Sequence, residues 1–108
     1  MTVDELSAFD ETPDPGSVES GELAVTDDVL VKAFAIGPGG SIPPHEHADA
    51  TNVFHVLRGT VVVERDGETE PVSAPGVVLN ERGQVHGAHN EGDDMAVLTA
   101  SLCPLPGQ

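Results

Sequence analysis

The sequence has few aromatic residues, one lysine and one cysteine. Its aromatic residues are three phenylalanines, and its 108 residues include no Trp or Tyr. A core without large aromatic side chains has to be built from Val, Leu, Ile and Ala, and valine-rich segments favour strands. The single cysteine, Cys103, excludes an internal disulfide and is typical of a reducing compartment.

Basic residues are also scarce. Four Lys and Arg stand against 19 Asp and Glu, which gives a formal net charge of −15. This balance opposes binding to nucleic acid or to anionic lipid, so we expect neither as a partner. In ~1 M salt the Debye length falls to about 3 Å, and self-repulsion of this kind is screened. The acid-rich, lysine-poor composition resembles that of proteins from salt-accumulating halophilic archaea.

The sequence lacks an apolar segment long enough to span a bilayer. Its acidic N-terminus also lacks the basic region of a signal peptide, so we expect a cytoplasmic protein. The length predicts one domain. Residues 1–20, which are acidic and contain Pro13 and Pro15, are predicted to form a weakly ordered arm with room for one short strand or turn. Residues 21–108 are predicted to form a barrel.

Short valine-rich segments alternate with Gly- and Pro-rich turns along most of the chain. This pattern predicts an all-β barrel or sandwich without helices. The tripeptide Asp66-Gly67-Glu68 is a hairpin turn signal. Residues 37–44 are predicted as a loop and residues 81–84 as a turn. The predicted strands are residues 29–36, 51–57, 60–66, 76–80 and 95–102. A further strand is predicted to start with the segment 85–90.

Two histidines, His45 and His47, stand one residue apart before a predicted strand. In an extended chain, residues two apart point to the same face, so the two imidazoles project together and Glu46 projects away. Pro43 and Pro44 stiffen the approach and favour extended geometry. Two such imidazoles can share a transition-metal ion at about 2.0–2.1 Å.

The spacing around these histidines resembles the first motif of the cupin superfamily, G-x5-H-x-H-x3,4-E-x6-G. Every spacing matches, but Asn52 stands where the motif has glutamate. A later segment resembles part of the second motif, P-x-G-x2-H-x3-N, with Glu81 at the proline position. The matching residues are Gly39, His45, His47, Asn52, Gly59, Gly83, His86 and Asn90.

The resemblance implies a double-stranded β-helix, or jelly-roll barrel, with one divalent transition metal per chain: Fe, Zn, Ni, Mn or Cu. His45, His47 and His86 would be its ligands. Without the glutamate, three neutral imidazoles leave the ion with its full charge, which favours an anionic or chelating ligand. Asn52 is either a weak ligand or a hydrogen-bond partner of bound water or substrate. A structural role for the histidines, or a site that has lost its metal, are the alternatives.

The remaining polar residues are predicted to lie outside the ligand set. His55 lies an odd number of residues from Asn52, and His89 from His86, so each is expected to point to the opposite strand face. His55 is predicted to pack or to face a dimer interface. Glu46 is predicted to be solvated, and so are Glu81 and Arg82 at the mouth of the barrel. Cys103 is predicted to be a small core residue. Core or cavity wall is predicted for Phe34, Phe54, Val56, Val61, Val63, Val78 and Leu98.

Two functions remain open from the sequence. The first is a metal-dependent enzyme that acts on a small polar or anionic metabolite, with dioxygenation first and isomerase or lyase chemistry next. No catalytic residue beyond the metal is assigned, and no organic cofactor is expected. The second is a non-catalytic module that binds or senses a metal or small ligand. Sheets with exposed faces also predict a homodimer, formed by sheet faces or by an exchanged N-terminal strand.

Overall fold

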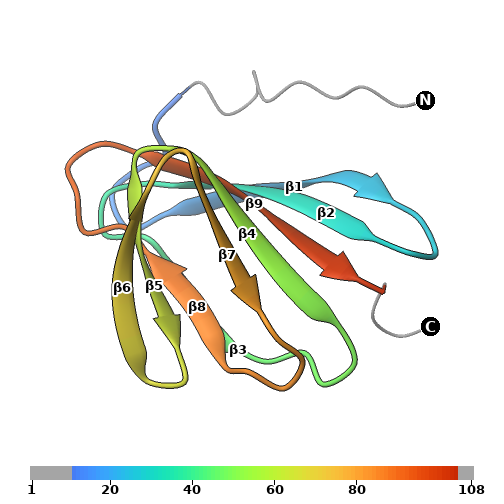
Figure 1. The fold of residues 1–108 in the computed structure, drawn as a ribbon. Helices are drawn as coiled ribbons and strands as arrows, with labels where there is room; N and C mark the ends of the chain where they lie inside the picture. Colours follow the sequence, from blue (N-terminus) through green and yellow to red (C-terminus); the bar gives the residue numbers. More distant parts are fainter. Residues whose placement is uncertain (1–10, 105–108) are drawn as a thin grey trace.

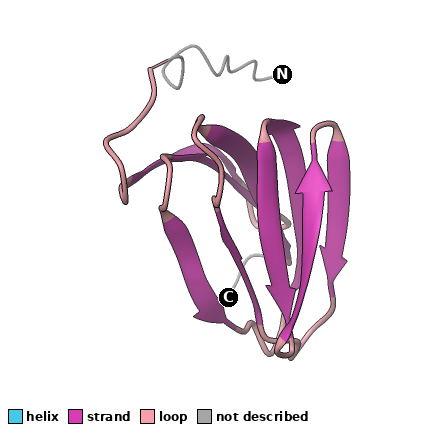
Figure 2. Ribbon diagram, turned by 90° about the vertical axis from the view of Figure 1, so that its left-hand side faces the viewer, coloured by secondary structure: helices cyan, strands magenta, loops and turns pink. Residues whose placement is uncertain are grey.

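The computed structural model describes residues 11–104, which form two facing antiparallel sheets (Figure 1). The first sheet has the strand order β1-β2-β9-β4-β7, and the second has the order β3-β8-β5-β6. Figure 2 shows strands and loops but no helix in the described part. The strands are β1 (Val18–Val25), β2 (Leu30–Ile36), β3 (Ser41–His45), β4 (Thr51–Arg58), β5 (Thr60–Arg65), β6 (Glu68–Ser73), β7 (Gly76–Asn80), β8 (His86–His89) and β9 (Ala96–Cys103).

The core lies between the two sheets and is built from alternate residues of the central strands. On β4 the side chains of Asn52, Phe54 and Val56 point inward and are buried, while His55 points outward and is exposed. Small and branched side chains from both sheets complete this core: Ile36, Ile42, Val61, Val63, Val78, Ala88, Ala96, Leu98 and Ala100. The all-β class and the core residues on these strands are therefore confirmed, with Phe34 partly buried against the core.

Three strands were not predicted from the sequence, and all three are edge strands. They are β1, β3 and β6, which end their sheets in the strand order. An edge strand has one unpaired side and tolerates proline and charge. The prediction of residues 37–44 as a loop is wrong from Ser41 onward, because Pro43 and Pro44 lie in β3 at a register shift against β8.

The N-terminal segment of the described chain is attached to the barrel before β1 begins. The Gly16 N–H donates to Pro38 O at 2.7 Å, and the Gly37 N–H donates to Ser17 O at 2.9 Å. Most of the predicted arm, residues 1–10, lies outside the described residues. The division at residue 20 stays a prediction, although β1 already begins at Val18. Within residues 11–104 no helix is long and apolar enough to cross a membrane.

Candidate metal centre

Two neighbouring strands and the loop after one of them bring three histidines together. His45 ends β3 and pairs in register with His86, the first residue of β8, while His47 lies two residues beyond β3. One ring nitrogen from each of the three lies within 4.8 Å of the others. The Gly83 N–H donates to His47 O at 3.0 Å, which ties the loop of His47 to the turn before β8. The structure therefore brings together the three histidines that the sequence predicted as ligands.

Backbone carbonyls determine which nitrogen of two rings faces the cluster. His45 Nδ1 lies 2.8 Å from Pro43 O, and His86 Nδ1 lies 2.9 Å from Gln84 O. A carbonyl oxygen only accepts, so each Nδ1 carries the proton and each Nε2 keeps its lone pair. His86 is 1% exposed, and its Nε2 has no hydrogen-bond partner among the described residues. A buried lone pair without a donor is unfavourable, and a cation would satisfy it.

Burial keeps two of the imidazoles in the form that binds metals. Desolvation lowers the pKa of His86, and the neighbouring His45 and His47 lower it further, against the opposing effect of the hydrogen bond to Gln84. Desolvation, followed by repulsion from His45, lowers the pKa of His47. Neutral imidazole is the ligand form, so the donor set fits a transition-metal ion. Phe54 packs edge-on against His86 at 5.7 Å between ring centroids and holds that ring in place.

Asn52 is buried beside the cluster and is paired with a second asparagine. Asn80, its register partner on β7, donates from Nδ2 to Asn52 Oδ1 at 2.9 Å. Asn80 is fully buried, and its own Oδ1 has no partner in the described chain. Sequence reasoning missed Asn80. The sequence feature that could have identified Asn80 is its place two residues after the core residue Val78, where a polar side chain at the end of an apolar strand points inward.

A cavity of about 180 Å³ adjoins the cluster. His45, His47 and Asn52 belong to its polar lining, and most of the remaining wall is aliphatic or aromatic: Leu30, Phe34, Ile42, Phe54 and Leu102. Lys32 also lines it, with Nζ 5.4 Å from the centroid of the Phe34 ring. No role for Lys32 was predicted from the sequence. Its signals were that it is the only lysine and that it shares strand parity with Phe34.

The other predicted polar residues lie apart from this cavity's lining. Glu46, Glu81 and Arg82 are exposed, as expected, and His89 pairs with Glu91 at 2.8 Å. His55 is also exposed, so it does not pack within the chain, and its place at a dimer interface stays a prediction. The prediction of Cys103 as a core residue is wrong, because its side chain is exposed. The alternation along β9 places Leu102 inward and so turns the following residue out.

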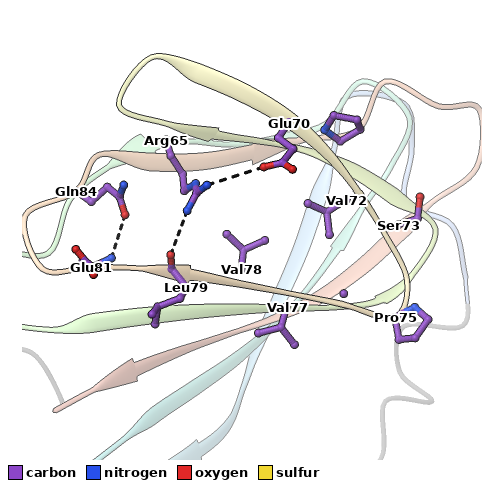
Figure 3. Close-up of a pocket in the computed structure, with 12 residues that line it drawn as sticks. Arg65, Glu70, Val72, Ser73, Pro75, Val77, Val78, Leu79, Glu81 and Gln84 are labelled. Atoms are coloured by element: carbon purple, nitrogen blue, oxygen red, sulfur yellow. Dashed lines mark hydrogen bonds and ion pairs between the residues drawn. The ribbon is translucent and has the colours of Figure 1, made fainter.

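A larger, open hollow of about 780 Å³ lies between β6 and β7, where the edges of the two sheets separate (Figure 3). Arg65 lies across it and already interacts with the chain: its Nη2 is 3.9 Å from Glu70 Oε2, and its Nη1 donates to Leu79 O at 3.5 Å. None of the three clustered histidines lines this hollow. The candidate chemistry therefore belongs to the smaller cavity.

Comparisons with known proteins give a matching family and similar curated proteins. The family described as Cupin domain matches residues 32–102. The chain is 38% identical over 85 residues to Germin-like protein 5-1 of Oryza sativa subsp. japonica, covering 73% of this chain and 38% of that protein. It is 29% identical over 83 residues to the Oxalate-binding protein of Thermotoga maritima, covering 72% of this chain and 69% of that protein.

A solved structure shares the fold over nearly the whole chain. The crystal structure of a Thermus thermophilus protein has a TM-score of 0.87 at 24% identity and covers 98% of this chain and 100% of that chain. Together with the family match, this likeness confirms the predicted jelly-roll barrel.

Proposed function

The chain belongs to the cupin domain family, and on this premise we propose that it is a metal-dependent enzyme for a small anionic metabolite. One divalent transition metal would be held by His45, His47 and His86. The observation that carries the proposal is the His86 Nε2 atom, which is buried without a hydrogen-bond partner in the described chain and lies beside two further imidazoles. The metabolite would occupy the adjoining cavity.

The chain's own groups would bind and orient the substrate. A bound divalent ion would supply Lewis acidity and, if it is redox-active, reactivity toward oxygen. The carbonyls of Pro43 and Gln84 hold two imidazoles in the ligand tautomer. The apolar wall that includes Ile42 and Phe54 would exclude water around the substrate. Imidazole ligands suit Fe, Zn, Ni and Cu, so the proposal names the site but not the metal. Dioxygenation remains our first reaction class, followed by isomerase or lyase chemistry.

One observation favours a second candidate, a non-catalytic binding module. Among the described residues, no Asp or Glu lines the cavity, so the chain offers no carboxylate there as a general base. A relative at 29% identity is named an oxalate-binding protein. A binding module would retain an anion without changing it, whereas an enzyme would convert it. Product analysis after incubation of the metal-loaded protein with candidate anions, in the presence and absence of oxygen, distinguishes the two functions.

Metal analysis of histidine variants tests the site itself. The parent protein, purified without a metal-affinity tag, should hold about one metal ion per chain. His47→Ala and His86→Ala should lose it and should melt at a lower temperature, because metal bound to the native state adds to stability. His55→Ala is the matched control, since this exposed histidine faces away from the core. Equal metal content in all four proteins would refute the site.

A further inference from the structure

We propose that Lys32 binds a second anionic group of the ligand, so that the cavity selects small dianions such as short dicarboxylates. This inference rests on the proposed function, in which the first anionic group lies at the metal. It assigns a specificity-determining role to Lys32 on β2, whereas the proposed metal ligands lie on β3, on β8 and in the loop after β3.

The position of the Lys32 ammonium group is the first argument. Nζ lies 5.4 Å from the centroid of Phe34, and both residues line the same cavity. A cation over an aromatic face is attracted to it, which holds the ammonium group at the cavity wall. Glu22 is the register partner of Lys32 on β1. The ion pairs of residues 11–104 are nevertheless Arg65–Glu70 and His89–Glu91, so neither Glu22 nor another described acid neutralises Lys32.

The charge of the whole chain is the second argument. With a formal net charge of −15, the protein repels an approaching anion. Binding a dianion therefore needs local positive charge at the cavity, and a metal held by the three histidines would supply it for the first anionic group. Lys32 is the only lysine among four basic residues, and it is the one basic residue in the described lining of this cavity. The ammonium group is thus placed where it can compensate the second negative charge.

The hydrogen-bonding character of Asn52 is the third argument. Its Oδ1 already accepts from Asn80 Nδ2 at 2.9 Å, so its Nδ2 is the group that remains to donate. If the nitrogen and oxygen of both amides were exchanged, the unpaired buried atom of Asn80 would be an N–H donor and no longer an oxygen. Buried N–H groups without a partner are rarer than buried oxygens without one, so the orientation with Asn52 Oδ1 as the acceptor is favoured. The cavity lining thus combines an ammonium group and an amide donor with no carboxylate in the described chain. That polar lining complements an anion.

The size of the cavity limits the ligand. Its volume of about 180 Å³ lies below the range of about 300–1,000 Å³ for pockets that bind drug-sized molecules. A dicarboxylate of two to four carbons combines two charges with so small a volume. Oxalate, malonate and succinate are therefore suitable probes, and acetate provides the single-charge reference.

The experiment titrates the metal-loaded full chain with these four anions at one fixed salt concentration. The variants are Lys32→Met, which removes the charge, and Lys32→Arg, which keeps it. Arg58→Met is the control for net charge, because Arg58 is exposed on β4, six residues and about 20 Å from Asn52 along the strand. Metal content is measured before and after each titration, since oxalate also chelates free metal.

We expect Lys32→Met to bind the best dicarboxylate about 10- to 100-fold more weakly, the range for loss of a charged hydrogen bond. Acetate affinity and metal content should stay within about twofold, and both Lys32→Arg and Arg58→Met should keep the preference for dicarboxylates. If Lys32→Met loses acetate and dicarboxylate affinity equally, or loses neither, the role of Lys32 is refuted while the metal site stands. A metal-loaded parent that binds none of the dicarboxylates also refutes the inference. A parent that holds no metal refutes the proposed function instead.

Discussion

At the scale of single residues, Asn52 determines the charge of the candidate site. A carboxylate at this position would neutralise one charge of a bound divalent ion, whereas the amide neutralises none. The pairing of Asn52 Oδ1 with Asn80 Nδ2 adds that the amide presents a donor to the cavity. Both effects favour an anionic ligand. We therefore predict that the neutral residue serves ligand binding; the alternative is a tolerated loss of the glutamate of the motif.

Asn52→Glu should separate these two accounts. The added carboxylate should keep metal content equal or higher, because a charged oxygen replaces a neutral one near the cation. Affinity for a dicarboxylate should fall by at least about tenfold, from repulsion and from the lost coordination position. Asn52→Gln has the length of glutamate without its charge and is the matched control. Calorimetric titration at equal metal loading measures both, and anion binding by Asn52→Glu equal to or tighter than the parent's would support the tolerated loss.

At the scale of elements, the contact between β3 and β8 holds the histidines together. His45 and His86 are register partners, and the register shifts between Ile42 and His45, where β3 contains its two prolines. Gly87 follows His86 and faces this irregular segment. A Cβ atom at Gly87 would lie 2.8 Å from Ile42 O and 3.0 Å from Pro44 N. Both atoms belong to the backbone, so β3 itself would have to move.

Gly87→Ala should therefore weaken metal binding without removing a ligand. We expect a loss of about 1–3 kcal/mol in the free energy of unfolding from overpacking. Metal affinity should fall by about tenfold as His45 moves away from His86. Gly92→Ala is the control, because its nearest contact, Asn90 Oδ1, lies at 3.4 Å. Thermal melts of the metal-free protein and competition with a metal chelator measure the two effects, and a Gly87→Ala protein equal to the parent in both would contradict this explanation.

At the scale of the whole molecule, the excess of acidic residues governs the response to salt. The ion pairs of the described residues are only Arg65–Glu70 and His89–Glu91, so most acidic side chains there have no basic partner. The Debye length falls from about 30 Å at 0.01 M to about 3 Å at 1 M salt, which removes most of their mutual repulsion. The melting temperature and solubility should rise between low and molar KCl. Sucrose, which carries no charge, is the control for general exclusion effects. A melting temperature that stays flat in KCl would contradict stabilisation by charge screening.

The outer surface of the first sheet suggests how two copies would associate. Val77 and Leu79 on the edge strand β7 are 66% and 52% exposed, and they pair in register with His55 and Val53. We predict a homodimer through this face, because apolar side chains on two copies can bury one another about a two-fold axis. Light scattering in high salt should give a dimer for the parent and a folded monomer for Val77→Asp/Leu79→Asp. A monomeric parent would contradict the dimer. A variant that remains dimeric would contradict association through this face and would favour a dimer formed by an exchanged N-terminal strand.

The sequence by itself determined the central strands, the inward residues and the histidine cluster. Period-two alternation is a local property, so Phe54 and Val56 could be assigned to the core without knowing which strand lies beside them. The ligand set His45, His47 and His86 was predicted from the resemblance of two segments to the cupin motifs, and the structure brings the three rings together. The edge strands β1, β3 and β6 were missed because most of their side chains face solvent, and β3 and β6 also contain proline, so the apolar alternation is weak.

Only the tertiary structure decided which residues surround the histidines. Asn52 and Asn80 are 28 residues apart in the sequence, and their hydrogen bond exists because β4 and β7 pair in one particular register. Lys32 lies on β2, which reaches the cavity through its pairing with β9. Register between distant strands results from the packing of both sheets at once, and no short segment of the sequence encodes it. The charge and hydrogen bonding of the cavity therefore emerged only from the folded barrel.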